Sequence, residues 1–166
     1  MWMAKEIFET IERDRNYLQP WLPFVELTTK LADTENFIQS ILNQPQIKKD
    51  EIYSIWFKNE FAGLIGFKDT DWLNRKTELG YWLAEKMQGK GIATKCVEKL
   101  IRYTFQKLKL NRIQIKTAVG NLNSAAIPKR LGFKFEGIER DGEKHNQTFV
   151  DLEIYSILKT DYKTAL

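Results

Sequence analysis

A short glycine-containing segment is the part of the sequence best suited to bind a ligand. Residues 88–93 read Gln-Gly-Lys-Gly-Ile-Ala, and they lie where a predicted strand gives way to a long predicted helix. The first N–H groups of a helix lack partners within the helix and carry partial positive charge, which suits phosphate oxygens. Gly89 and Gly91 allow positive φ and close approach to a ligand, and Lys90 adds a formal charge. We therefore predict that the backbone N–H groups of Gly89–Ala93 bind a diphosphate.

Two common phosphate-binding motifs do not fit this segment. A dinucleotide-binding fingerprint requires a third glycine, and a P-loop requires Gly-Lys followed by Ser or Thr at a fixed spacing. Two glycines between a strand and a helix can also form only a tight turn, so the rest of the sequence has to identify the ligand.

Other reactive side chains are scattered along the chain. Asp151 and Glu153 alternate with Tyr155 on one face of the last predicted strand, where they attract a cationic amine or face solvent. His145, the one histidine, falls in a predicted hairpin loop and is expected to be a surface residue. Cys96 lies on the apolar stripe of the long helix and is expected to be a buried structural thiol. The sequence has no cluster of cysteine, histidine and carboxylate residues at metal-site spacing, so we predict no metal.

The elements that must position these groups form an α+β domain. Periodicity predicts helices at 4–18, 33–43, 92–108 and 124–131, and strands at 51–58, 61–68, 77–84, 112–119, 133–136 and 148–158. Asp33 is the predicted N-cap of the second helix. This order predicts one mixed, mostly antiparallel sheet with helices packed on it. Because no repeat, linker or low-complexity segment divides the chain, we expect residues 1–166 to form a single domain.

The composition excludes several classes of protein. With 166 residues and 43% hydrophobic content, the chain can bury a sizeable core, which excludes a disordered protein. No apolar run approaches the roughly 20 residues needed to span a bilayer, so no membrane contact is expected. A single cysteine favours a reducing, cytoplasmic location. The net charge of +4 suits an anionic ligand, but the sequence has no nucleic-acid-binding motif, and we expect no direct contact with nucleic acid.

Two long segments identify a family. The segment NRKTELGYWLAEKMQGKGIATKCVEKLI, residues 74–101, resembles the coenzyme A loop of the GCN5-related N-acetyltransferases (GNAT), whose pattern is Q/R-x-x-G-x-G/A. The segment NRIQIKTAVGNLNSAAIPKRLGFKFEGIERDG, residues 111–142, is similar to the second half of the same fold. Together with YLQPWLPF at 17–24, the chain resembles the RimJ/RimL branch, the ribosomal-protein N-terminal acetyltransferases, over residues 5–162. The resemblance implies acetyl-CoA as donor and an amine as acceptor.

The resemblance also implies where the coenzyme binds. In this family the sheet splays after the strand predicted here at 77–84, and the pantetheine arm pairs with that strand as an added strand would. The residues that would bind the coenzyme are Tyr81, Trp82, Leu83, Gln88, Gly89, Lys90, Gly91, Ile92, Ala93, Asn121 and Asn123.

The reaction also needs an acid, because the departing thiolate must be protonated or stabilised. The resemblance places Ser124 near the thioester sulfur, where its hydroxyl can donate that proton. Asn121 and Ser124 also fit ordinary capping at the start of the short helix. Many GNAT enzymes have a tyrosine in the Y-x-x-L-G-F context, where this chain has Pro128, which cannot donate a proton. Ser124 is therefore the predicted acid.

Glu78 is the predicted base. It lies on the strand that opens toward the coenzyme, in a position like that of a catalytic glutamate in several relatives, although it could also be a surface carboxylate on the outer face. An α-amine has a pKa of about 7.7–8.0 against about 10.4 for lysine, so a weak or water-relayed base suffices for an N-terminal acceptor.

Three functions remain open from the sequence. The first is acetylation of a protein N-terminus, which the QPWLPF segment at 19–24 favours. The second is acetylation of a polyamine or another small amine, because such enzymes share the coenzyme loop. The third is a non-catalytic acyl-CoA-binding protein with a regulatory role, which would keep the same glycines.

The start of the chain departs from the family. Relatives usually begin with a strand, whereas this chain is predicted to be helical by about Lys5. Loss of that strand would leave an exposed sheet edge, which invites pairing between chains. We therefore expect a homo-oligomer.

Overall fold

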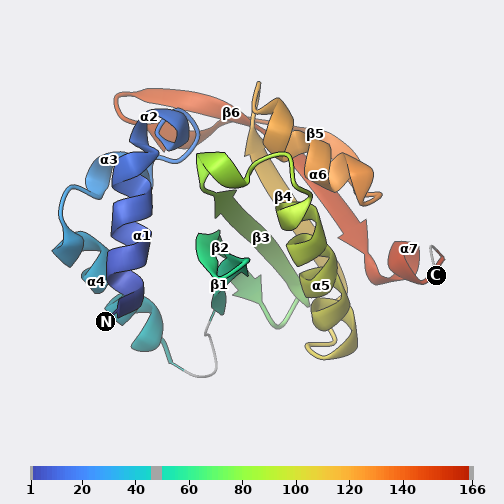
Figure 1. The fold of residues 1–166 in the computed structure, drawn as a ribbon. Helices are drawn as coiled ribbons and strands as arrows, with labels where there is room; N and C mark the ends of the chain where they lie inside the picture. Colours follow the sequence, from blue (N-terminus) through green and yellow to red (C-terminus); the bar gives the residue numbers. More distant parts are fainter. Residues whose placement is uncertain (1, 46–49, 165–166) are drawn as a thin grey trace.

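The computed structural model describes residues 2–45 and 50–164, and its centre is a six-stranded sheet (Figure 1). The strands run in the order β1-β2-β3-β4-β6-β5 across the sheet. Their bounds are β1 Ile52–Phe57, β2 Glu60–Asp71, β3 Lys76–Leu83, β4 Arg112–Ala118, β5 Lys134–His145 and β6 Thr148–Leu158. All neighbouring pairs are antiparallel except β3 with β4. The predicted mixed, mostly antiparallel sheet is thus confirmed.

Helices cover both faces of this sheet (Figure 1). Their bounds are α1 Trp2–Arg13, α2 Arg15–Leu18, α3 Phe24–Leu27, α4 Leu31–Leu42, α5 Ile92–Gln106, α6 Leu122–Arg130 and α7 Lys159–Thr164, with a 3₁₀ turn at Glu85–Met87. The first four helices lie on one side and α5 lies on the other. None of the helices in the described ranges is long and apolar enough to cross a membrane.

The core consists of two apolar clusters on opposite faces of the sheet. One cluster joins Ile7 and Ile11 of α1 to Leu64 of β2 and Trp82 of β3. The other joins α5 to side chains that point the opposite way, among them Leu79. Successive residues of a strand point to opposite faces, so β3 contributes to both clusters. This strand therefore connects the helices on the two sides of the sheet.

The predicted helix at 4–18 was wrong in its length, because it is divided at Asp14. The Asp14 side chain is buried, with 6% exposed, and its carboxylate accepts a hydrogen bond from the backbone N–H of Glu85 at 2.9 Å. The neighbouring Arg13 guanidinium also donates to it at 2.8 Å. A tertiary contact to the 3₁₀ turn that follows β3 thus determines where α1 ends, and the local apolar pattern does not encode that contact.

Asp33 was wrongly predicted as an N-cap, because the helix begins two residues earlier. In α4, Asp33 is the third helical residue, and its carboxylate accepts hydrogen bonds from the N–H groups of Thr29 and Lys30 at 2.9 and 3.0 Å. A carboxylate in the first turn satisfies free N–H groups and interacts well with the helix dipole. Asp33 therefore stabilises the helix start from inside the helix, by accepting the N–H groups of the two residues that precede it.

Strand β5 is much longer than the predicted 133–136, since it continues to His145. Register shifts between Phe135 and Gly137, and again between Glu139 and Glu143, interrupt its pairing with β6. These irregularities break the simple alternation of apolar and polar residues, which is why the sequence pattern stops early.

The parallel contact between β3 and β4 covers three residue pairs only. Lys76, Thr77 and Glu78 pair with Arg112, Ile113 and Gln114, and beyond them the two strands separate. From there β3 continues beside β2, and β4 continues beside β6. The predicted splay of the central strand is therefore present and begins directly after Glu78.

Strand β1 forms one edge of the sheet, and within the described residues no strand precedes α1. The opposite edge is β5. The expectation of a homo-oligomer through an open edge stays a prediction.

An ion pair stabilises the second half of the sheet in a pH-dependent way. The Arg112 guanidinium of β4 donates to the Glu136 carboxylate of β5 at 2.6 Å, and it lowers the pKa of that carboxyl to about 2 from an ordinary 4.5. A lowered pKa in the folded state stabilises the protein above pH 4.5, and this contribution is lost as the pH falls toward 2. We expect Glu136→Gln to lower the free energy of unfolding at pH 7 and to leave it less changed between pH 4.5 and 2. Solvent screening keeps the effect at about 1 kcal/mol or less. Urea unfolding of the wild-type protein and the variant at pH 7 and pH 3 measures this difference. If both proteins lose the same free energy of unfolding between pH 7 and pH 3, the prediction is wrong.

Candidate active site

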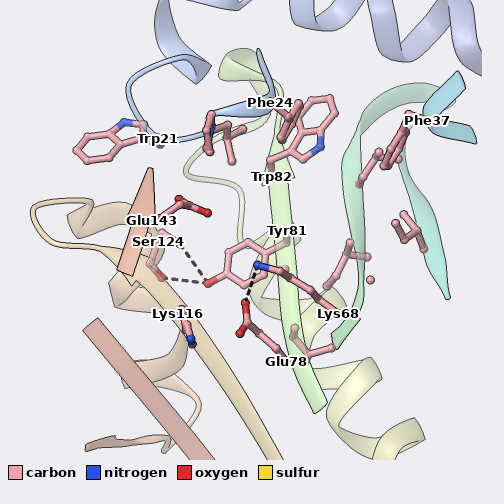
Figure 2. A pocket seen from close by; sticks show the side chains of 18 of the residues that line it. Trp21, Phe24, Phe37, Lys68, Glu78, Tyr81, Trp82, Lys116, Ser124 and Glu143 are labelled. Atoms are coloured by element: carbon pink, nitrogen blue, oxygen red, sulfur yellow. Dashed lines mark hydrogen bonds and ion pairs between the residues drawn. The ribbon is translucent and has the colours of Figure 1, made fainter. Parts of the chain in front are cut away.

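Two cavities meet at the splay between β3 and β4. The large cavity, of about 760 Å³, lies between the sheet and helices α1, α3 and α4 (Figure 2). The small cavity, of about 70 Å³, lies between α2, α6 and the segment at 88–93. Six residues line both: Trp21, Leu22, Tyr81, Trp82, Asn121 and Ser124. Molecules entering from the two sides would therefore meet beside Tyr81 and Ser124.

The glycine segment has the backbone conformation that the sequence predicts. Gly89 and Gly91 both have φ of +71°, and Gly91 is the N-cap of α5. A Cβ atom built on either glycine meets nothing within 4 Å, so this side of the turn is open. In the described part of the chain, the N–H groups of Gly89–Ala93 have no hydrogen-bond partner. Five unpaired donors at one helix start form the arrangement that a diphosphate satisfies.

The open edge of β3 presents alternate backbone groups toward the splay. The N–H of Ala84 donates to the carbonyl of Ala62 at 2.8 Å, so alternation makes the pair of Trp82 with Leu64 the next hydrogen-bonded pair. Tyr81 and Leu83 then turn their N–H and C=O groups away from β2, toward the opening. The Leu83 carbonyl accepts the Gln88 side chain at 3.3 Å. Of the three residues expected to supply backbone partners, Tyr81 and Leu83 have groups directed there, and Trp82 contributes its side chain to both cavities.

Ser124 both belongs to a capped helix start and faces the junction of the cavities. The Asn121 side chain accepts the N–H of Ser124 at 3.1 Å, which is ordinary N-cap chemistry. The Ser124 hydroxyl lies 3.5 Å from the Tyr81 hydroxyl, and the latter donates to the Ser124 carbonyl at 3.1 Å (Figure 2). Asn123 is exposed and lines the small cavity. Ser124 therefore belongs to a capped helix start and also lies at the junction of the two cavities.

The Tyr81 side chain is a polar group of the site that the sequence reasoning missed, because only its backbone was considered. Burial raises the pKa of its hydroxyl to about 12, while the Ser124 hydrogen bond acts in the opposite direction. The phenol therefore stays protonated at neutral pH and can donate a proton or a hydrogen bond beside Ser124.

Glu78 is buried, which excludes the alternative that it is a surface carboxylate on the outer face. Its side chain lines the large cavity, and the residue is 9% exposed. Its Oε2 accepts the Gln114 side chain at 3.1 Å, and its Oε1 lies 3.6 Å from the Lys68 ammonium (Figure 2). Both oxygens of the predicted base are thus already engaged.

Glu143 is a second carboxylate of the large cavity, and the sequence reasoning missed it. It extends from β5 and lines the large cavity, as Ser124 and Trp21 do (Figure 2). Its Oε2 lies 2.8 Å from Nε2 of His145, and its Oε1 has no protein partner within the described ranges. The residue was missed because β5 was predicted to end before it. The signal available was a carboxylate and a histidine two apart, directly before a turn.

His145 was wrongly predicted as a surface residue of a hairpin loop. It is the last residue of β5, is 9% exposed, and contacts Glu143. The hairpin turn follows it at 146–147. The polar composition of the segment does not indicate a strand, although Glu143 and His145 lie on one face of it and Lys144 is exposed on the other.

The remaining candidates lie outside the two cavities. Asp151 accepts the N–H of Asp141 at 2.8 Å, and Glu153 accepts the hydroxyl of Tyr155 at 2.6 Å. Cys96 on α5 is half-buried, less than the buried thiol that the sequence predicts, and its burial raises the pKa of the thiol. The described residues contain no group of three or more histidine, cysteine or carboxylate side chains arranged to hold a metal ion.

Comparisons with known proteins agree with this geometry. The model of a family described as an acetyltransferase (GNAT) domain matches residues 4–134. The chain is 38% identical, over 96% of its length and 88% of the relative's, to YdaF of Bacillus subtilis (strain 168), provisionally named a ribosomal N-acetyltransferase. It is 30% identical, over 92% of its length and 86% of the relative's, to the ribosomal-protein-serine acetyltransferase of Escherichia coli (strain K12). A solved structure of RimL, the ribosomal L7/L12 alpha-N-protein acetyltransferase, in complex with coenzyme A, superimposes with a TM-score of 0.85 at 26% identity, covering 91% of this chain and 85% of that one.

Proposed function

The chain belongs to the GNAT acetyltransferase family, and on that premise we propose that it acetylates the N-terminal amine of a protein, using acetyl-CoA. A ribosomal protein is the acceptor favoured by the names of the relatives. The observation that carries the proposal is the meeting of two cavities at Tyr81 and Ser124, next to five unpaired N–H groups at the start of α5. A thioester arriving through the small cavity would meet an amine from the large cavity at this junction.

The coenzyme is proposed to bind along the small cavity and the open edge of β3. The N–H groups of Gly89–Ala93 would hold the diphosphate, with Lys90 and Gln88 at the rim. The pantetheine arm would pair with the free backbone groups of Tyr81 and Leu83, as an added strand does. Asn123 would contact the arm from the opposite wall, and so would the Asn121 side-chain amide, whose Oδ1 is occupied by the cap.

The chemistry is proposed as direct attack of the amine nitrogen on the thioester carbonyl carbon. The new C–N bond forms, the C–S bond breaks, and the amine loses one proton while the thiolate gains one. Ser124 would donate the proton to the thiolate, and the Tyr81 hydroxyl, which accepts the Ser124 hydroxyl at 3.5 Å, would orient it before the reaction. Glu143 is our proposed acceptor of the amine proton, since its Oε1 has no protein partner among the described residues, whereas Glu78 is engaged at both oxygens.

The proposal is tested by free-thiol release from acetyl-CoA in the presence of a panel of amines. The panel contains peptides with free N-termini, the same peptides blocked at the N-terminus but carrying a lysine, and spermidine. We expect thiol release with the free N-termini and little with the blocked peptides. Release with spermidine alone would replace the proposed acceptor by a small amine, and no release with any amine would contradict an enzymatic function.

Ser124→Ala is expected to lower kcat by about 10-fold to 100-fold, because general-acid assistance by a positioned side chain is typically worth at least that much. The Kd for acetyl-CoA is expected to stay within about twofold, because the proposed diphosphate contacts come from the backbone at 89–93. Steady-state thiol release and calorimetric titration measure the two quantities. Ser124→Thr, which keeps the hydroxyl, is the matched control and should recover part of kcat. A weaker Kd with unchanged kcat would make Ser124 a positioning residue.

A further inference from the structure

We propose that the acceptor carries one amine and, within its first two residues, a large apolar side chain that lies over Gly80 against Phe24, Phe37 and Trp82. This inference rests on the proposed function and specifies its substrate class. It follows from three features of the large cavity: its apolar wall, its glycine floor and the pairing of its charged groups.

The apolar wall consists of large side chains left exposed inside a concave surface. Phe24 of α3 is 38% exposed, Phe37 of α4 is 41% exposed, and both line the large cavity (Figure 2). Phe24 lies against Trp82, with ring centroids 6.4 Å apart. Leu27 and Ile52, which are 76% and 36% exposed, extend this wall. Covering such a surface with apolar atoms is favourable, and its concave shape suits one side chain rather than a flat protein interface.

The floor of the cavity has a recess at Gly80. On β3 this glycine lies between Glu78 and Trp82, whose side chains point to the same face of the sheet. A Cβ atom built on Gly80 meets nothing within 4 Å, and its φ is not in the positive range. The backbone therefore does not require glycine here. The absent side chain leaves room between a carboxylate and an indole, directly beside Tyr81, which contacts Ser124.

The charged groups of the cavity do not suit a polyamine. Each carboxylate that lines the cavity already has a protein partner: Glu78 has Lys68 and Gln114, Glu143 has His145, and Asp33 has two backbone N–H groups. Two lysines, Lys68 and Lys116, line the same cavity. Both lysines are paired as well, Lys68 with Glu78 and Lys116 with Glu139. Among the described residues, the two glutamates of this cavity thus leave only Oε1 of Glu143 without a protein partner, and that oxygen is assigned to the reacting amine. A second ammonium group would therefore find no carboxylate that lacks a protein partner, whereas an apolar side chain would meet the wall. These contacts favour a monoamine with a bulky apolar substituent.

The test compares acceptors that differ only near the amine. Peptides that begin Phe-Ala, Ser-Phe and Ser-Ala and share the remaining sequence are assayed for thiol release, together with spermidine. We expect the better phenylalanine peptide to exceed the Ser-Ala peptide by about tenfold or more in kcat/KM, since even one methylene in an apolar pocket is worth roughly tenfold or more. Equal values for the peptides, or a higher value for spermidine, would overturn the inference.

Variants of the large cavity test whether its residues cause the preference for a phenylalanine peptide. Gly80→Val, which fills the recess with a residue suited to a strand, is expected to lower kcat/KM for the preferred peptide about tenfold more than it lowers kcat/KM for the Ser-Ala peptide. Phe37→Ala should reduce the preference as well. Phe149→Ala is the matched control, because Phe149 is 57% exposed and does not line the large cavity, and it should leave the preference unchanged.

Two failures are distinguishable. A preference that survives both Gly80→Val and Phe37→Ala would overturn the location we assign, and turnover without any preference would overturn the substrate class alone. Absence of thiol release with every amine would refute the proposed function and this inference together.

Discussion

Glu143→Gln is expected to lower kcat by about 100-fold to 1,000-fold, within the range that general-base catalysis contributes. The variant keeps the size of the side chain and its contact with His145, 2.8 Å from the carboxylate, but removes the group that takes the proton. Because the loss affects the transition state and not coenzyme binding, kcat and kcat/KM should fall together while the Kd for acetyl-CoA stays unchanged. Thiol release across pH 6–9 with an N-terminal peptide measures both parameters.

Glu78→Gln is the matched comparison, since both residues are carboxylates of the same cavity. Its oxygens are engaged by Lys68 and Gln114, so we expect a loss of about tenfold or less, chiefly through KM. The reverse order, with Glu78→Gln losing far more kcat than Glu143→Gln, would make Glu78 the base, as the sequence alone predicts. Full activity in both variants would indicate that an already neutral α-amine needs no protein base.

Gly91→Val is expected to weaken acetyl-CoA binding by about 100-fold or more. At φ of +71° a β-branched residue is strongly disfavoured, so the turn must change and its N–H groups lose their common direction. Each charge-assisted hydrogen bond to a phosphate is worth roughly 1.5–3 kcal/mol, so losing one or two accounts for this factor. Calorimetric titration with acetyl-CoA measures the change.

Gly132→Val controls for backbone strain alone. Gly132 has a similar φ of +77°, lies just after α6, and lines neither cavity. Both variants should lose stability in urea unfolding, but the Gly132 variant should bind acetyl-CoA normally once folded. Unchanged affinity in Gly91→Val would mean that the glycine segment does not hold the diphosphate.

The parts of the site that depend on local chemistry were predictable from the sequence. The positive φ of Gly89 and Gly91 follows from the glycines themselves, and the helix start at Ile92 follows from the apolar period behind it. The splay after Glu78 came from the family resemblance rather than from periodicity, because a strand pattern does not reveal where its neighbour leaves it.

The parts that depend on distant contacts were not predictable. Asp14 ends α1 because it accepts the N–H of Glu85, which is 71 residues away in sequence. Glu143 reaches the large cavity because β5 continues through two register shifts, and such shifts are invisible in an alternation pattern. The large cavity is likewise a product of packing between α1, α3, α4 and the sheet. The residues of its apolar wall come together only in the folded structure, so the sequence does not indicate them.

The parallel contact between β3 and β4, with three residue pairs, is the shortest pairing in the sheet. Three strands lie on each side of this contact, and the splay beyond it separates the two halves of the sheet. A ligand bound in the splay would contact both halves and would stabilise the folded state. With the ligand at about 100 times its Kd, the folded state would gain about 2.7 kcal/mol.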